Sequence, residues 1–157
     1  MSAEKPRSVW NANRREIVAV LAVVVLFSIF AGQWKSNGVE FEFGETQMTI
    51  TGPEGAPEPV ILAYAEIHSA TLQEDLDLGS MEDGLDDSSY RFGTWRNREF
   101  DRYTLCSCVG LSEYIVLETA KGTVVFNYQD ADTTAHLYKA IVELLESKGL
   151  EVGAGAG

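Results

Sequence analysis

Two cysteines on one predicted strand carry the most reactive side chains of this 157-residue sequence. Cys106 and Cys108 flank Ser107, and side chains at positions i and i+2 of a strand point to the same face about 7 Å apart. That separation strains a disulfide between them, and a metal site would need two further ligands. His68 and His136 are the only histidines, and no motif connects them with the cysteines. We expect the cysteines to fill the strand, with a disulfide or a redox function as the alternative.

Arginines interleaved with aromatic residues form the candidate interaction surface. It consists of Arg91, Trp95, Arg96, Arg98 and Arg102. Such interleaving can bind nucleic acid by stacking, but residues 36–157 contain seven basic side chains against 22 acidic ones, which opposes contact with phosphates. Pairing of these arginines with the acidic stretch of the same domain is the simpler interpretation. We expect binding of neither nucleic acid nor phosphoinositides.

The acidic stretch itself, residues 74–87 (EDLDLGSMEDGLDD), contains seven carboxylates. Calcium takes several oxygen ligands, but a calcium-loop pattern that starts at Asp75 fails where Gly79 and Ser80 replace an oxygen ligand and a glycine. We expect a solvated loop, with a weak divalent-cation site as the alternative. The sequence contains no nucleophile motif and no glycine-rich phosphate loop, so we expect a protein that is not an enzyme and has no cofactor.

One domain must position all of these side chains, because 157 residues leave little room for a second. Apolar residues make up 45% of the chain and charged residues 23%, as in folded globular proteins. The net charge of −12 is distributed unevenly: residues 1–35 contain five basic and two acidic side chains, so the other 122 residues carry −15. The two parts are therefore expected to face different surroundings.

An apolar stretch at residues 17–31 has Ser28 as its only polar residue and follows Arg14, Arg15 and Glu16. Extended to Trp34, it would measure about 27 Å as a helix, close to the ~30 Å hydrocarbon core of a bilayer. We predict a transmembrane helix over residues 17–34 after a cytoplasmic segment 1–16, because basic residues before a span hold that end in the cytoplasm. A cleaved secretory signal is the alternative, although no pair of small residues marks a cleavage site.

From residue 39 onward the apolar residues alternate with polar ones, which predicts strands. Strands are expected over residues 39–43 and 48–51, and residues 52–59, with three prolines, form a loop. Further strands are expected over residues 60–72, 90–95, 103–109, 114–119 and 123–128, the last two joined by a hairpin turn at residues 120–122.

The period then becomes helical. Asp130 or Asp132 can cap a helix whose apolar stripe includes Leu137 and Ile141 and which ends at Gly149. Residues 150–157, rich in glycine and alanine, are expected to form a flexible tail.

Residues 90–145 resemble the bacterial pleckstrin-homology-like (PH-like) domains that follow membrane helices in Gram-positive bacteria. The resemblance rests on the aromatic-Arg-Phe-Gly-x-aromatic run at residues 90–95, the hairpin at Gly122, and the step from Phe126 and Asn127 into a helix that opens with acidic residues and Thr134. It implies a mainly β fold, a PH-like barrel of about seven antiparallel strands with a C-terminal capping helix. We expect this PH-like domain over residues 35–149, after the transmembrane helix.

Together these features favour a membrane-anchored, non-catalytic binding or scaffolding module. Its N-terminus would lie in the cytoplasm, its single span in the cell membrane and its PH-like domain outside, where we expect a protein partner. Two alternatives remain: an enzyme or redox protein that uses Cys106 and Cys108, and a secreted ligand-binding domain released by signal cleavage.

Overall fold

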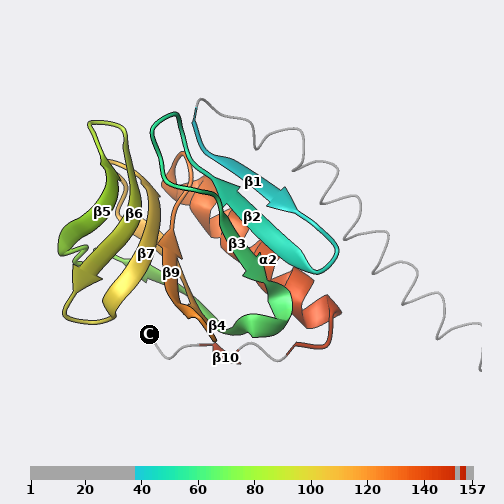
Figure 1. Ribbon diagram of the computed structural model, residues 1–157. Coiled ribbons are helices and arrows are strands. Elements are labelled where there is room, and N and C mark those ends of the chain that lie inside the picture. The colour runs from blue at the N-terminus through green and yellow to red at the C-terminus, as the bar shows by residue number, and fades with distance from the viewer. Residues whose placement is uncertain (1–37, 151–152, 155–157) are drawn as a thin grey trace, which may run out of the picture. The chain divides into compact units, whose positions relative to one another are not determined.

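Strands dominate the part of the chain that the computed structural model describes, residues 38–150 and 153–154. Three of them form a small antiparallel sheet in the order β1-β2-β3. They are β1 (Glu40–Phe43), β2 (Gln47–Thr51) and β3 (Val60–Ala63). A short 3-10 helix, η1 (Tyr64–Glu66), then carries the chain from this sheet to a second one (Figure 1).

The second sheet contains the other described strands in the order β10-β4-β8-β9-β7-β6-β5. They are β4 (Ile67–Glu74), β5 (Ser80–Asp86), β6 (Tyr90–Asn97), β7 (Asp101–Cys108), β8 (Glu113–Thr119), β9 (Gly122–Phe126) and the two-residue β10 (Gly153–Ala154). Neighbouring strands are antiparallel except for β7 with β9 and β10 with β4, which are parallel. The helix α2 (Ala131–Ser147) follows β9.

The expected fold, a transmembrane helix followed by a PH-like barrel of about seven antiparallel strands, is wrong. The described residues form ten strands in two sheets with two parallel pairings, and one C-terminal helix. None of the helices within residues 38–150 has the length and apolar character needed to cross a membrane. The predicted span at residues 17–34 lies outside the described residues.

The main core lies between the small sheet, one face of the large sheet and α2. The ring of Phe41 on β1 packs against Phe126 of β9 and against Tyr128, with centroids 5.6 and 5.2 Å apart. From α2, Leu137 and Ile141 are buried, as the helical stripe predicted, and the helix contacts β4 and β8. The alternating apolar side chains of the small sheet therefore pack against those of the large sheet.

A polar cap at its start and a glycine at its end define the limits of α2. The side chain of Asp130 accepts a hydrogen bond from the backbone N–H of Thr133 at 2.7 Å, which satisfies one free donor of the first turn. The buried Thr134 hydroxyl donates to the carbonyl oxygen of Tyr128 at 3.0 Å. At the other end Gly149 has a φ of +72°, the left-handed conformation that closes many helices.

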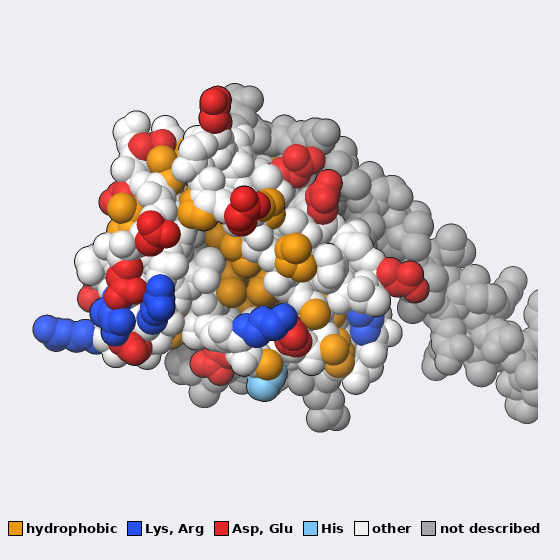
Figure 2. Space-filling model, viewed as in Figure 1, with side chains coloured by type: hydrophobic (Ala, Val, Ile, Leu, Met, Phe, Trp, Pro, Cys, Tyr) orange, Lys and Arg blue, Asp and Glu red, His pale blue; other side chains and the backbone are white. Residues whose placement is uncertain are grey.

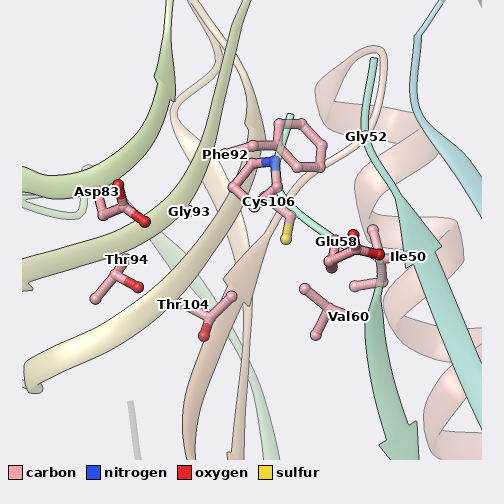
Figure 3. A pocket seen from close by; sticks show the side chains of 11 residues that line it. Ile50, Gly52, Glu58, Val60, Asp83, Phe92, Gly93, Thr94, Thr104 and Cys106 are labelled. Carbon is pink, nitrogen blue, oxygen red and sulfur yellow. The ribbon is translucent and has the colours of Figure 1, made fainter. Parts of the chain in front are cut away.

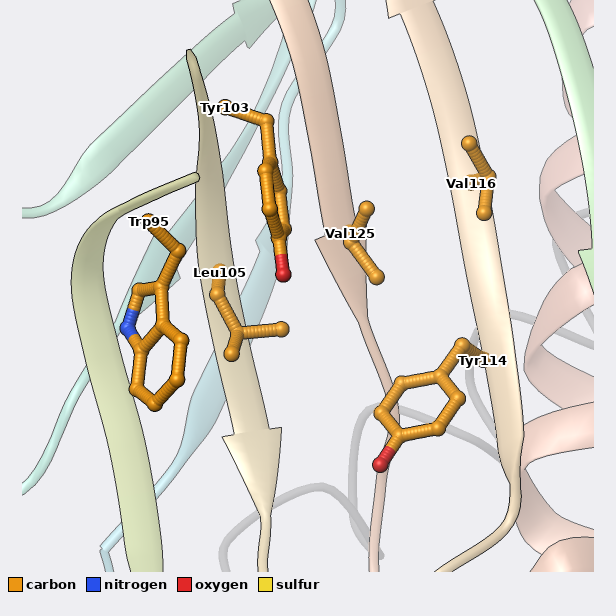
Figure 4. Close-up of a cluster of buried hydrophobic side chains, with 6 residues drawn as sticks. All are labelled: Trp95, Tyr103, Leu105, Tyr114, Val116 and Val125. Carbon is orange, nitrogen blue, oxygen red and sulfur yellow. The ribbon is translucent and has the colours of Figure 1, made fainter. Parts of the chain in front are cut away.

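A second cluster of buried residues covers the opposite face of the large sheet (Figure 4). It consists of Trp95, Tyr103, Leu105, Tyr114, Val116 and Val125, against which Leu76, Leu78 and Phe100 pack. The hydroxyl of Tyr103 donates to the carbonyl oxygen of Leu78 at 2.8 Å, and the side-chain amide of Asn97 donates to that of Asp77, also at 2.8 Å. These contacts fix the chain just before β5.

The acidic stretch is therefore not a solvated loop throughout. Residues 80–86 form β5, an edge strand of the large sheet that pairs with β6. The predicted strand over residues 60–72 is likewise two strands, β3 and β4, which belong to different sheets and are separated by η1.

Candidate functional site

A hollow of about 190 Å³ opens between β3, at the edge of the small sheet, and the neighbouring face of β6 and β7. Figure 2 shows hydrophobic side chains at the bottom of a depression on this side of the molecule, with both acidic and basic side chains around it. We call this hollow the inter-sheet groove. The small sheet contributes Ile50 and Val60, and the loop between β2 and β3 contributes Pro57 and Glu58.

Strand pairing arranges the opposite wall in two rows (Figure 3). Phe92 of β6 stands opposite Cys106 of β7, and both are buried, so this row is the apolar floor. The next row runs from Asp83 on β5 through Thr94 on β6 to Thr104 on β7. Because Thr94 and Thr104 are only half-buried, their hydroxyls can meet a ligand that enters the groove.

Two facing glycines bring Asp83 to this position. Gly84 and Gly93 are paired across β5 and β6, with φ angles of +134° and +132°. A Cβ atom on Gly93 would lie 2.2 Å from the carbonyl oxygen of Asp83, and one on Gly84 would lie 2.0 Å from that of Phe92. The close approach of β5 to β6 therefore depends on both glycines.

Carboxylates stand on two sides of the groove. Asp83 comes from β5 and Glu58 from the loop before β3, and Figure 3 places them on opposite sides of the lining. Within residues 38–150 neither carboxylate forms an ion pair. The groove thus combines an apolar floor, two hydroxyls and two carboxylates that have no cationic partner in the described part of the chain.

Three of the four arginines of the candidate interaction surface pair with residues of the acidic stretch, as the sequence predicted for all four. Arg91 Nε lies 3.2 Å from Asp86, Arg96 Nε 2.6 Å from Glu82, and Arg102 Nε 3.1 Å from the same Glu82. The hydrogen bond from Arg96 holds the pKa of Glu82 below its usual value. Most of the positive charge of this cluster is therefore balanced on the surface of the domain.

The other two members of that predicted surface differ from these arginines. Trp95 is 4% exposed and belongs to the second buried cluster, with the guanidinium of Arg91 5.9 Å from its ring centroid. Arg98 is exposed and has no ion pair with any other described residue. The structure thus separates residues that the sequence grouped as one surface.

Both cysteines are free thiols. Cys106 is fully buried, and this burial raises the pKa of its thiol to about 12. Burial also raises the pKa of the half-buried Cys108, partly offset by a backbone hydrogen bond from Gln129. Because the thiolate is the reactive form, these environments do not activate either cysteine as a nucleophile at neutral pH.

Metal binding has no arranged site in the described residues, where no three His, Cys, Asp or Glu side chains are grouped to hold an ion. Three of the acidic side chains of residues 74–87 instead make separate contacts: Glu82 and Asp86 pair with arginines, and Asp87 accepts backbone hydrogen bonds from Ser89 and Tyr90. Those backbone bonds hold the pKa of Asp87 below its usual value.

The groove residues Glu58, Asp83, Thr94 and Thr104 were not recognised in the sequence. No motif joins them, because they come from a loop and three strands that only the packing of two sheets brings together. Gly93, within the run at residues 90–95, was the one feature of the sequence that pointed to this region, since an isolated glycine in a strand often marks a close approach of another backbone. Comparisons of the chain with family models, curated proteins and solved structures found no match.

Proposed function

We propose that the chain is a non-catalytic module that binds another protein, and that the inter-sheet groove is its binding site. The observation that carries this proposal is the hollow of about 190 Å³ with an apolar floor and unpaired carboxylates at its rim. Pockets for small molecules and cofactors measure roughly 300–1,000 Å³. A cavity of roughly 150 Å³ holds a group of about the size of benzene, so the groove suits one side chain of a protein partner.

The edge of the small sheet supports the same conclusion. β3 is an edge strand of sequence VILA, without a charged residue, and Ile61 in its middle is 55% exposed. Extended segments of partner proteins bind by adding a strand to such an edge. At one edge of the large sheet, β5 is acidic and has an irregular register between Met81 and Asp83, features that block strand addition.

Filling the groove should abolish binding of the partner. Thr104→Phe keeps a residue that favours strands but adds bulk to the groove wall, whereas Thr71→Phe makes the same change on β4, outside the lining. We would use the whole chain, in detergent, as bait for solubilised membrane proteins. Proteins retained by the wild type and Thr71→Phe should be lost with Thr104→Phe, and equal retention by all three would refute the groove as the binding site.

The location of the module outside the cell membrane stays a prediction from the charges around residues 17–34, which lie outside the described residues. Protease added to intact protoplasts should remove the folded domain. Digestion that occurs only after lysis would place the module in the cytoplasm instead.

A further inference from the structure

We propose that the inter-sheet groove takes the side chain of a lysine or arginine from an extended segment of the partner. This inference rests on the proposed function and specifies the chemistry of the occupant. The aliphatic part of the basic side chain lies over the apolar floor of Phe92 and Val60, and its charged end lies at the rim, which carries Asp83 on one side and Glu58 on the other.

The charge at the rim of the groove is the first argument. Arg96 lies two residues beyond Thr94 on β6 and Arg102 two residues before Thr104 on β7, so both are near the groove. Their charges are already balanced, because Glu82 pairs with both of them and Asp101 with Arg96. What remains at the rim is the uncompensated negative charge of Asp83 and Glu58, which attracts a cation.

The shape and lining of the groove favour a long basic side chain over other occupants. Lysine and arginine bury their methylene groups against apolar surface while the charged head stays near water. Here Phe92 and Cys106 form a buried apolar floor, the half-buried hydroxyls of Thr94 and Thr104 line the wall, and the exposed carboxylates of Asp83 and Glu58 lie on two sides of the rim. An acidic side chain would be repelled, and a purely apolar one would gain nothing from the negative charge at the rim.

The partner backbone is expected to be extended, because β3 forms one side of the groove and is an edge strand. Side chains of an added strand alternate between two faces, so one basic residue enters the groove while its neighbours point away. A second copy of this domain is disfavoured as the occupant, since residues 36–157 carry 22 acidic and only seven basic side chains.

Two synthetic peptides that differ only in charge test this inference. The first is acetyl-Thr-Val-Arg-Val-Thr-amide, and the second has citrulline, a neutral analogue of nearly the same shape, in place of arginine. Titrated against the whole chain in detergent by calorimetry, the citrulline peptide should bind about tenfold more weakly, because it loses charge-assisted hydrogen bonds.

Matched variants of the protein test the two carboxylates. Asp83→Asn and Glu58→Gln should each weaken binding of the arginine peptide roughly threefold, as expected for exposed charge pairs, without changing binding of the citrulline peptide. Glu143→Gln removes the same charge from the exposed face of α2, away from the groove, and should leave the affinity unchanged. Thr104→Phe should abolish binding of the arginine peptide.

The possible results separate this inference from the proposed function. Equal affinities for both peptides, both lost in Thr104→Phe, would refute the basic side chain but keep the groove as a protein-binding site. Binding of the arginine peptide that survives Thr104→Phe would refute both. No binding of either peptide up to about 1 mM would refute the inference, and the capture experiment would still decide the proposed function. Dimers of the chain that disappear in Thr104→Phe would assign the groove to a second copy and overturn the basic occupant.

Discussion

Replacing Gly93 by alanine should detach the strand that brings Asp83 to the groove. Gly93 adopts a φ of +132°, and a Cβ atom there would lie 2.2 Å from the carbonyl oxygen of Asp83 and 2.7 Å from the Cα atom of Gly84. Both contacts are with the backbone of β5, which cannot rotate away as a side chain could. We therefore expect Gly93→Ala to push β5 away from β6.

Gly122 provides a matched control for the size of this effect. Its φ of +124° is nearly the same, but no atom lies within 4 Å of the position of its Cβ. Gly122→Ala should therefore cost only the backbone strain, about 1–3 kcal/mol of unfolding free energy. Gly93→Ala should cost the same strain and a further ~1–3 kcal/mol for the overlap with β5.

Urea unfolding of the whole chain in detergent, followed by circular dichroism, would give both free energies. Limited proteolysis of the folded variants adds a local measurement, because a displaced β5 should be cut faster within residues 80–86. If the two variants lose the same free energy, within about 0.5 kcal/mol, and β5 stays equally resistant, the close pairing of β5 with β6 is refuted.

Three further predictions concern the helix and the cysteines. Leu137→Ala should lower the unfolding free energy by about 2–5 kcal/mol, since Leu137 is fully buried, and a loss below about 1 kcal/mol would show that α2 is peripheral. Asp130→Ala should cost about 1 kcal/mol at neutral pH by removing the helix cap. The backbone hydrogen bond from Thr133 lowers the pKa of Asp130, so this stabilisation is present above pH 3.8, the ordinary aspartate value, and is lost as the pH falls through the lower folded value. In urea titrations the difference from the wild type should shrink on acidification, and a constant difference would contradict the cap. Iodoacetamide at neutral pH should label Cys108 before Cys106, whose pKa is raised to about 12, and peptide mass spectrometry showing the reverse order would refute the burial of Cys106.

Local elements follow closely from the sequence. The helix predicted between Asp130 and Gly149 extends over Ala131–Ser147 and is capped by Asp130, because capping and the apolar stripe are properties of neighbouring residues. The hairpin between β8 and β9 also lies where it was expected. The pairing of three of the four arginines with the acidic stretch was predictable as well, because carboxylates are dense in that stretch and it precedes the arginines closely in sequence.

Sheet membership could not be predicted in this way. The apolar run over residues 60–72 reads as one strand, yet η1 divides it between two sheets, and Tyr64 within η1 is buried with its hydroxyl donating to the carbonyl oxygen of Gly44 at 3.1 Å. The acidic sequence of β5 predicts a loop, because its side chains are mostly exposed and lack an alternating apolar pattern. Its strand conformation comes from pairing with β6, to which Gly84 and Gly93 are adapted.

The sequence by itself determined the local features of this protein. These are an apolar N-terminal stretch, an acidic remainder with mainly β patterns, and a capped helix; the sequence has no catalytic motif. The tertiary structure decided which residues form the inter-sheet groove. Glu58 and Asp83 are far apart in sequence and line the same groove only because the edge of one sheet packs beside the face of another. Side-chain alternation indicates which face of a strand is buried, but not which strands lie opposite it, since that depends on how both sheets and α2 bury their apolar surfaces together.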